Sequence, residues 1–243
     1  MLALAAEPPL VDDRRASELA AIERALTELD RQDLPDQGGA LLRQAVELTR
    51  AAGSVLELEA QPSPAELDAA ATRAGLRLTR DLLQLRRPLP IVEHTDLAVR
   101  PFVPDQDEPA WLELNNRAFA WHPDQAGWSV ADLRTREREP WFDPRGFLLH
   151  ERDGRLVGFC WTKVHRDEQP PLGEIYVIAV DPAFHGRGLG RELAIAGLEH
   201  LGSLGLDTAM LYVEADNEPA LALYRSLGFK HHHSHRWYRS GLP

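Results

Sequence analysis

The stretch Asp-Pro-Ala-Phe-His-Gly-Arg-Gly-Leu-Gly-Arg, residues 181–191, decides the fold that we predict for this chain. It follows the apolar, largely β-branched run 175–180, which predicts a buried strand, and it precedes residues 192–204, where leucines recur with helical spacing. The glycines of the stretch allow backbone conformations that other residues avoid. Successive N–H groups can therefore converge on one anion at the positive end of a helix dipole. Because Arg187 and Arg191 add positive charge, this strand, loop and helix start predict a pyrophosphate site.

Glycine spacing alone would also fit an ordinary turn between a strand and a helix. The stretch lacks the Gly-Lys-Ser/Thr ending of a Walker loop and the Gly-x-Gly-x-x-Gly of a Rossmann loop. Downstream stand Asn-Glu-Pro-Ala at 217–220 and Leu-Tyr-Arg-Ser-Leu-Gly-Phe at 223–229. Together with the loop, these motifs resemble the acetyl-coenzyme A signature of the GNAT acyltransferases. The resemblance implies a mixed α/β fold, with a six- or seven-stranded mixed sheet and helices on both faces.

The composition limits the kind of protein that the chain can form. Its 243 residues suit one large domain, or one complete domain with a partial one. Apolar residues make up 44% and charged residues 27%, as in soluble globular proteins. The formal net charge of −11 argues against general nucleic-acid binding. We therefore expect a protein whose basic residues near 187 serve local recognition.

The cysteine content and the lack of long apolar runs predict a cytoplasmic location. The lone Cys160 excludes an internal disulfide and fits a reducing cytosol. It lies in the apolar run 157–161, which predicts a packed thiol in preference to a nucleophile. The first residues lack a basic leader, and no apolar run reaches membrane-spanning length, so neither secretion nor membrane contact is expected.

We predict three parts along the chain: a helical tail at 1–37 whose residues 1–11 are loose, a partial and degenerate GNAT-like half-domain at 38–93, and a complete catalytic GNAT domain at 94–243. Periodicity, caps and turn residues predict helices at 12–34, 40–52, 64–75, 107–120, 129 onward, 192–204 and 218–227. Strands are predicted at 54–60, 76–89, 97–103, 147–151, 156–165, 174–180, 207–213 and 229–237. The helix after Ser63 should begin with a capping box.

An internal repeat relates the two GNAT-like parts. A shift of 153 residues places the strand 54–60 on 207–213, and Gly75 on Gly228, without a gap. In the first copy Gln-Asp-Leu-Pro-Asp-Gln, residues 32–37, stands where the second has the glycine-rich loop. Carboxylates and a proline there replace arginines and glycines. We therefore expect no pyrophosphate binding in the first copy, and a structural role for it.

The GNAT resemblance implies roles for individual residues. In GNAT enzymes a tyrosine at the position of Tyr224 protonates the departing thiolate. The ordinary alternative is a tyrosine that anchors an amphipathic helix. The first copy of the repeat has Ala71 at the equivalent position, which supports the specific role of Tyr224. Glu174 would draw the proton from the acceptor amine, whereas a solvated charge at a strand end is the alternative. The positions that match acetyl-coenzyme A contacts, the thioester lying beside the first three, are Ile178, Ala179, Val180, His185, Gly186, Arg187, Gly188, Leu189, Gly190, Arg191, Asn217, Glu218, Pro219, Ala220, Leu221 and Ala222.

A closer resemblance concerns the acceptor. The runs 115–120, 122–128, 141–144, 158–165 and 173–177 look like the mycothiol synthase family of GNAT enzymes, which acetylates the cysteinyl amine of cysteinyl-glucosaminyl-inositol to complete mycothiol. The substrate-contacting positions that match are Asp124, Lys163, Glu174 and Tyr212. Asp124 departs from the expected glutamate, and the family's first domain is complete where this one is half present. The shorter Asp124 side chain changes the reach of this acceptor group without removing it, whereas the missing part of the first domain puts one acceptor contact in doubt.

Other readings stay open. The enzyme could acetylate another amine or a peptide N-terminus, or the chain could be a non-catalytic acetyl-coenzyme A sensor. The four histidines between His231 and His235 invite a metal site, but no carboxylate or cysteine stands near them in sequence, and we predict a solvated strand instead. We expect a monomer that takes a small-molecule acceptor, uses acetyl-coenzyme A as co-substrate and holds no metal.

Overall fold

The chain, in a computed structural model that describes residues 1–120, 125 and 127–241, divides into two compact units. Unit 1 contains residues 1–85, 212–222 and 231–243, and unit 2 contains residues 86–211 and 223–230. The sequence predicted continuous parts, and that division into domains stays a prediction. In the structure the C-terminal segments 212–222 and 231–243 group with the first 85 residues.

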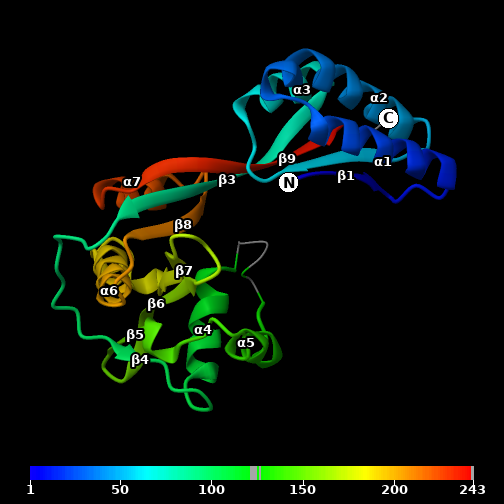
Figure 1. Ribbon diagram of the computed structural model, residues 1–243. Coiled ribbons are helices and arrows are strands. Elements are labelled where there is room, and N and C mark those ends of the chain that lie inside the picture. The colour runs from blue at the N-terminus through cyan, green and yellow to red at the C-terminus, as the bar shows by residue number, and fades with distance from the viewer. Residues whose placement is uncertain (121–124, 126, 242–243) are drawn as a thin grey trace. The chain divides into compact units, whose positions relative to one another are not determined.

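Unit 1 is a sheet with helices on one face. Its strands lie in the order β1 (Leu2–Glu7), β2 (Val55–Ala60), β9 (Lys230–Ser240), β3 (Leu76–Pro88), with β1–β2 and β2–β9 antiparallel. Helices α1 (Asp13–Glu28), α2 (Gly39–Arg50) and α3 (Ala65–Arg73) cover this face (Figure 1). The short turns η1 (Arg31–Asp33) and η2 (Leu34–Gly38) precede α2. The core forms because alternate residues of β2 point at the helices; its members include Ile22, Leu26, Leu42, Leu56, Leu58 and Leu67.

Two local expectations for this unit are wrong. The expected loose tail at 1–11 is wrong for residues 2–7, because Leu2 to Glu7 pair along β2 from Ala60 to Val55. The capping box at Ser63 does not form either. Pro64 takes the N-cap position of α3 without a side-chain cap, and the Ser63 backbone N–H donates instead to the Ser234 carbonyl. In both cases a partner distant in the sequence decides the local structure.

Unit 2 has helices on both faces of its sheet. The strand order is β8 (Thr208–Glu214), β7 (Leu172–Val180), β6 (Arg155–His165), β5 (Phe147–Arg152), β4 (Arg100–Pro101), and β8 crosses into unit 1 after residue 211. α4 (Glu108–Ala118) and α5 (Val130–Glu137) lie on one side and α6 (Leu189–Ser203) on the other (Figure 1). The α7 helix (Glu218–Ser226) and the turns η3 (Pro144–Gly146) and η4 (Pro182–Phe184) complete the elements. This mixed sheet with helices on both faces is the predicted GNAT arrangement.

Aromatic rings fill the space between the sheet and α4. The Trp111 ring lies 5.5 Å from Phe147, 5.3 Å from Phe159 and 5.8 Å from Trp161, each in an edge-on geometry. On the opposite face α6 approaches closely. A Cβ added at Gly197 would lie 2.5 Å from the Cys160 sulfur, so the predicted packing role of this buried cysteine is confirmed.

The strands of unit 2 agree with the sequence except at the first. β4 contains only Arg100 and Pro101, so the predicted strand 97–103 is mostly extended chain without a ladder. The hairpin between β5 and β6 turns at Asp153 and Gly154, both with positive φ, as its Asp-Gly sequence predicts. Ser129 caps α5 through a complete capping box with Asp132.

The positions of the helices and strands agree with the predicted internal repeat. The shift of 153 residues carries α3 (Ala65–Arg73) onto α7 (Glu218–Ser226), with both ends matching. It also carries the start of β2 onto the start of β8, and Gly75, at φ 78°, onto Gly228, at φ 77°. The same glycine-ended helix is therefore used twice.

Strand β7 is irregular at two places that bear on function. Its register with β6 shifts between Trp161–Val177 and Thr162–Ile175, which leaves Tyr176 as a bulge residue. Its parallel pairing with β8 covers Gly173–Ala209 and Glu174–Met210, and within the described part of this unit it stops there. Within unit 2 the described pairing of β7 with β8 therefore lies at the start of β7.

Candidate functional site

The loop between β7 and α6 has backbone N–H groups that find no partner among the described residues. Gly186 and Gly188 adopt φ values of 74° and 77°, and Gly188 is the left-handed N-cap of α6. The backbone N–H groups of residues 186–190 make no hydrogen bond to any other described residue, whereas those of Arg191 and Glu192 bond the Gly188 carbonyl. Consecutive free donors at the positive end of a helix form an anion site.

Gly190 differs from the other two glycines. Its φ is not in the left-handed region, and an added Cβ would make only ordinary contacts, 3.8 Å from Val180 and 3.9 Å from Leu223. The expectation that all the loop glycines need special backbone conformations is therefore wrong for Gly190. The guanidinium of Arg187 lies 5.3 Å from the Phe184 ring, and that of Arg152 lies 5.9 Å from the same ring. Positive charge thus flanks the loop.

Asp181 anchors the start of the loop. Its carboxylate accepts from the Ala183 backbone N–H, from Arg117 of α4 and from Arg155 of β6, the latter two at 2.8 Å. Burial by itself would raise the pKa of Asp181, but the Ala183 N–H and the two guanidiniums outweigh it, and the pKa is lowered. The Asp181 carboxylate thereby links helix α4, strand β6 and the start of the loop.

Glu174 lies inside the protein and has a partner. The structure rules out the solvated strand-end alternative, because its side chain is 8% exposed and accepts from His165 Nε2 at 2.7 Å. Lys163 stands opposite Glu174 in the β6–β7 register. The Lys163 ammonium lies over the rings of Trp141, at 4.8 Å, and Tyr176, at 5.5 Å. The structure thus brings Glu174 and Lys163, two of the predicted site residues, into one cluster.

Tyr224 is buried at 6% exposure, on the part of α7 that belongs to unit 2. Its ring packs edge-on at 5.7 Å from Phe229. Burial, with a smaller contribution from Cys160, raises the pKa of its phenol, and burial raises the pKa of the Cys160 thiol to about 12. Among the described residues the phenol hydroxyl has no hydrogen-bond partner. The hydroxyl therefore stays protonated and free to donate.

Several of the remaining predicted residues belong to unit 1. Asn217 to Ala222 and Tyr212 belong to unit 1, where the Asn217 side chain accepts from the Ala220 N–H at 3.2 Å and starts α7. The Tyr212 hydroxyl accepts from Gln84 Nε2 at 2.7 Å. Asp124 lies outside the described residues.

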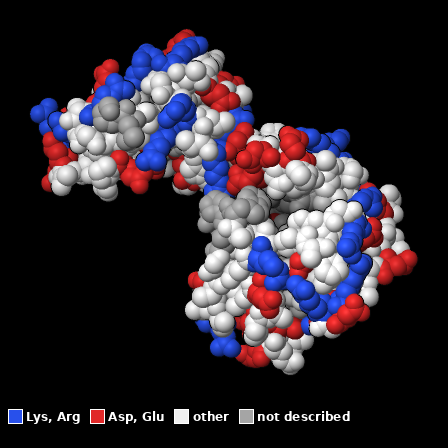
Figure 2. Space-filling view, turned by 180° about the vertical axis from the view of Figure 1, so that it is seen from behind, with Lys and Arg blue, Asp and Glu red and all other residues white. Residues whose placement is uncertain are grey.

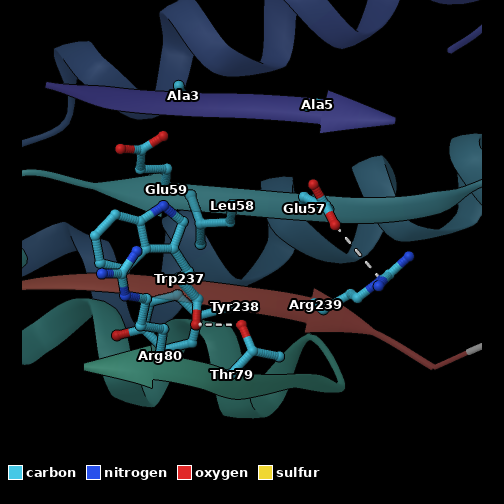
Figure 3. Close-up of a pocket in the computed structure, with 10 residues that line it drawn as sticks. All are labelled: Ala3, Ala5, Glu57, Leu58, Glu59, Thr79, Arg80, Trp237, Tyr238 and Arg239. Atoms are coloured by element: carbon cyan, nitrogen blue, oxygen red, sulfur yellow. Dashed lines mark hydrogen bonds and ion pairs between the residues drawn. The ribbon is translucent and has the colours of Figure 1, made fainter. Parts of the chain in front are cut away.

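One described cavity in unit 1 is lined by none of the predicted site residues. It measures about 300 Å³ and lies on the sheet face opposite α1, α2 and α3, above the small side chains of Ala3 and Ala5 (Figure 3). Its polar groups pair with one another: Glu57 lies 3.5 Å from Arg239, and Arg80 stacks at 4.8 Å over Trp237. A self-paired surface of this kind gives no sign of catalysis.

Elsewhere on the surface, side chains of both charges are intermingled. Figure 2 shows acidic and basic side chains interspersed over the visible face, with no single basic field. Within the described residues no group of histidine, cysteine and carboxylate side chains is arranged to hold a metal ion, and the rings from His232 to His235 contact one another. None of the described helices combines the length and apolarity that crossing a membrane requires.

The fold and the loop define the class of protein. A search of known families matches residues 108–229 to the acetyltransferase (GNAT) family, and the chain belongs to this family. A solved GCN5-related N-acetyltransferase from Sphaerobacter thermophilus shares the fold, with a TM-score of 0.62, 22% identity, and coverage of 84% of this chain and 67% of that one.

More specific relatives are the mycothiol acetyltransferases. That of Thermomonospora curvata is 50% identical over 212 residues, covering 85% of this chain and 69% of the relative. That of Acidimicrobium ferrooxidans is 57% identical over 164 residues, covering 64% and 52%. Within the GNAT enzymes the chain therefore belongs to the mycothiol acetyltransferase family. It spans about half to two thirds of the length of these relatives, 52% to 69% among the first four.

Sequence reasoning missed two groups of residues here. Arg117 and Arg155, which hold Asp181, lie far from it in the sequence, and only the fold brings them together. His165 could have been found, because a hairpin with Lys163 opposite Glu174 puts side chains two residues apart on one face.

The Asp181 anchor predicts a pH-dependent loss of stability on mutation. Because the folded-state pKa is lowered, the carboxylate stabilises the fold above its ordinary pKa of about 3.9, and this contribution is lost as the pH falls through the folded pKa. Asp181→Asn should lower the unfolding free energy at pH 7 by about 1–3 kcal/mol. The difference should shrink below about pH 4 in urea titrations.

The exposed Asp167→Asn serves as the matched control and should change little. If the two substitutions cost the same, or the Asp181 difference stays constant down to the lowest pH at which the chain folds, Asp181 is not the anchor.

Proposed function

We propose that this protein transfers the acetyl group of acetyl-coenzyme A to the cysteinyl amine of cysteinyl-glucosaminyl-inositol, the last step of mycothiol formation. The observation that carries the proposal is the loop at 186–190, whose backbone donors lack protein partners at the start of α6, inside the region that matches the GNAT family. The relatives' name, mycothiol acetyltransferase, supports the acceptor.

In this proposal the loop residues His185 to Arg191 bind the pyrophosphate of acetyl-coenzyme A. The charges of Arg187 and Arg191 complement the phosphates. Ile178, Ala179 and Val180 lie at the C-terminal end of β7, and their backbone would bind the pantetheine arm and polarise the thioester carbonyl. Asn217 to Ala222 would line the pantetheine and adenosine, as the GNAT resemblance implies.

Glu174 and Tyr224 are the proposed acid–base pair. Glu174 takes one proton from the acceptor ammonium, and the neutral amine nitrogen then attacks the thioester carbonyl carbon. The C–N bond forms, the C–S bond breaks, and the Tyr224 hydroxyl gives its proton to the departing sulfur. The second proton, which the nitrogen loses as it becomes an amide, passes through water to the phenolate and restores Tyr224. The Glu174 carboxylate, held by His165, is placed to act as a general base. A phenol with a raised pKa holds its proton until a thiolate forms.

Lys163, Glu174 and Tyr212 are proposed to contact the polyol acceptor, with Asp124 as a further contact outside the described residues. Lys163 presents its ammonium between aromatic rings, beside the buried carboxylate. A sugar-linked acceptor needs such fixed donors and acceptors next to flat apolar surface. We further propose that the protein acts as a monomer in the cytoplasm, with no metal and with neither nucleic acid nor membrane as partner; its acidic net charge and buried thiol support this.

Acceptor turnover tests the function directly. With acetyl-coenzyme A present, cysteinyl-glucosaminyl-inositol should release free coenzyme A and gain one acetyl group by mass spectrometry, because the site is built for an amine beside a polyol. Peptides with free N-termini should give little product. Turnover of peptides alone would favour a different GNAT transferase, and cofactor binding without turnover of any amine would favour a sensor.

Removing the Tyr224 hydroxyl should separate chemistry from binding. Tyr224→Phe should lower kcat by about 10²–10⁴-fold, because the thiolate then leaves without a positioned proton donor. The dissociation constant of coenzyme A should be nearly unchanged in calorimetry. Tyr238→Phe, which removes a phenol bonded to Asp68 in unit 1, is the control and should keep its kcat. An unaltered kcat for Tyr224→Phe would rule out the acid role.

A further inference from the structure

His165 is the residue that fixes the orientation of Glu174. β6 and β7 run antiparallel, with Lys163 opposite Glu174 and His165 opposite Leu172. This register lets the His165 ring reach diagonally across the pair, and its Nε2 lies 2.7 Å from Glu174 Oε2. The contact joins two neighbouring strands of one sheet and is therefore held by the backbone ladder.

The two carboxylate oxygens of Glu174 have different surroundings. Among the described residues His165 is the one side chain hydrogen-bonded to this carboxylate, and it binds Oε2. Oε1 has no hydrogen-bond partner there, and it is not among the fully buried unpaired atoms. One oxygen is thus occupied by the protein, while the other is accessible to a ligand.

The ammonium of Lys163 does not replace His165 in this task. Lys163 stands directly opposite Glu174, but its charge lies over the rings of Trp141 and Tyr176. A buried carboxylate without a hydrogen-bond donor is costly and free to rotate. The side chain of His165 is 21% exposed and that of Glu174 is 8% exposed. His165 therefore covers the Glu174 carboxylate on the side that is nearer to solvent.

We propose that His165 is a positioning residue for the acetyl transfer. Its Nε2–H donates to Glu174 Oε2 and holds the carboxylate so that Oε1 faces the acceptor ammonium. The ammonium proton moves to Oε1, and His165 keeps its own proton throughout. This inference rests on the proposed function and adds to it a residue that acts only through Glu174.

The proposal predicts a loss of kcat that depends on Glu174. His165→Leu should lower kcat by about 10–100-fold, because a misdirected base loses much of its effect, while KM for acetyl-coenzyme A stays unchanged. His165→Gln places an amide N–H near the position of Nε2 and should recover most of that loss. In Glu174→Gln, adding His165→Leu should cause no further loss, because the two residues act as one unit.

The matched control is His94→Leu. His94 also contacts a glutamate, Glu199, but on the surface, and kcat should not change. Should His165→Leu fail to fold, His165→Asn replaces it, because its shorter amide does not reach Oε2, and His165→Gln should then exceed it in kcat.

Three results would overturn the proposal: an unchanged kcat in His165→Leu, equal kcat in His165→Asn and His165→Gln, or full additivity with Glu174→Gln. Failure of the proposed function would give a different experimental result. In that case the unchanged protein itself would not acetylate the acceptor, whatever residue stands at 165.

Discussion

The rest of the structure depends on the backbone N–H groups at residues 186–190, which have no hydrogen-bond partner in the described part of the chain. Orphan donors at a helix start cost free energy unless water or a ligand satisfies them, so a fold that keeps them needs to hold the loop in place. Asp181 does this by binding Arg117 of α4 and Arg155 of β6. Two left-handed glycines then turn the chain into α6 with its donors still free.

Strand β7 links this loop to the proposed chemistry. Glu174 stands near its start and Val180 at its end, about 20 Å apart at the usual rise of a strand. Between them the strand bulges at Tyr176. One strand thereby carries a candidate phosphate site and a candidate base, with Tyr224 supplied from α7.

Much of this was predictable from sequence where the signal is local. The helix 218–226, the Asp-Gly hairpin, the strand-loop-helix at 181–191 and the repeat around Gly75 and Gly228 all follow from periodicity and glycine positions. The failures involve distant partners. Leu2 to Glu7 form a strand because β2 pairs with them, and Arg117 reaches Asp181 only through the fold. The roles of Glu174 and Tyr224 came from resemblance; their burial and partners came from the structure.

The central claim is that the loop at 186–190 binds the phosphates of coenzyme A. The coenzyme A affinities of two glycine variants test it most directly. Gly188 and Gly205 lie at opposite ends of α6 with φ values of 77° and 75°, and an added Cβ would meet nothing within 4 Å at either. Alanine should therefore strain both alike, by about 1–2 kcal/mol. Isothermal titration calorimetry should show coenzyme A binding weakened about tenfold or more by Gly188→Ala, and unchanged by Gly205→Ala. Equal affinities in the two variants would contradict the assignment of the loop at 186–190 as the phosphate site.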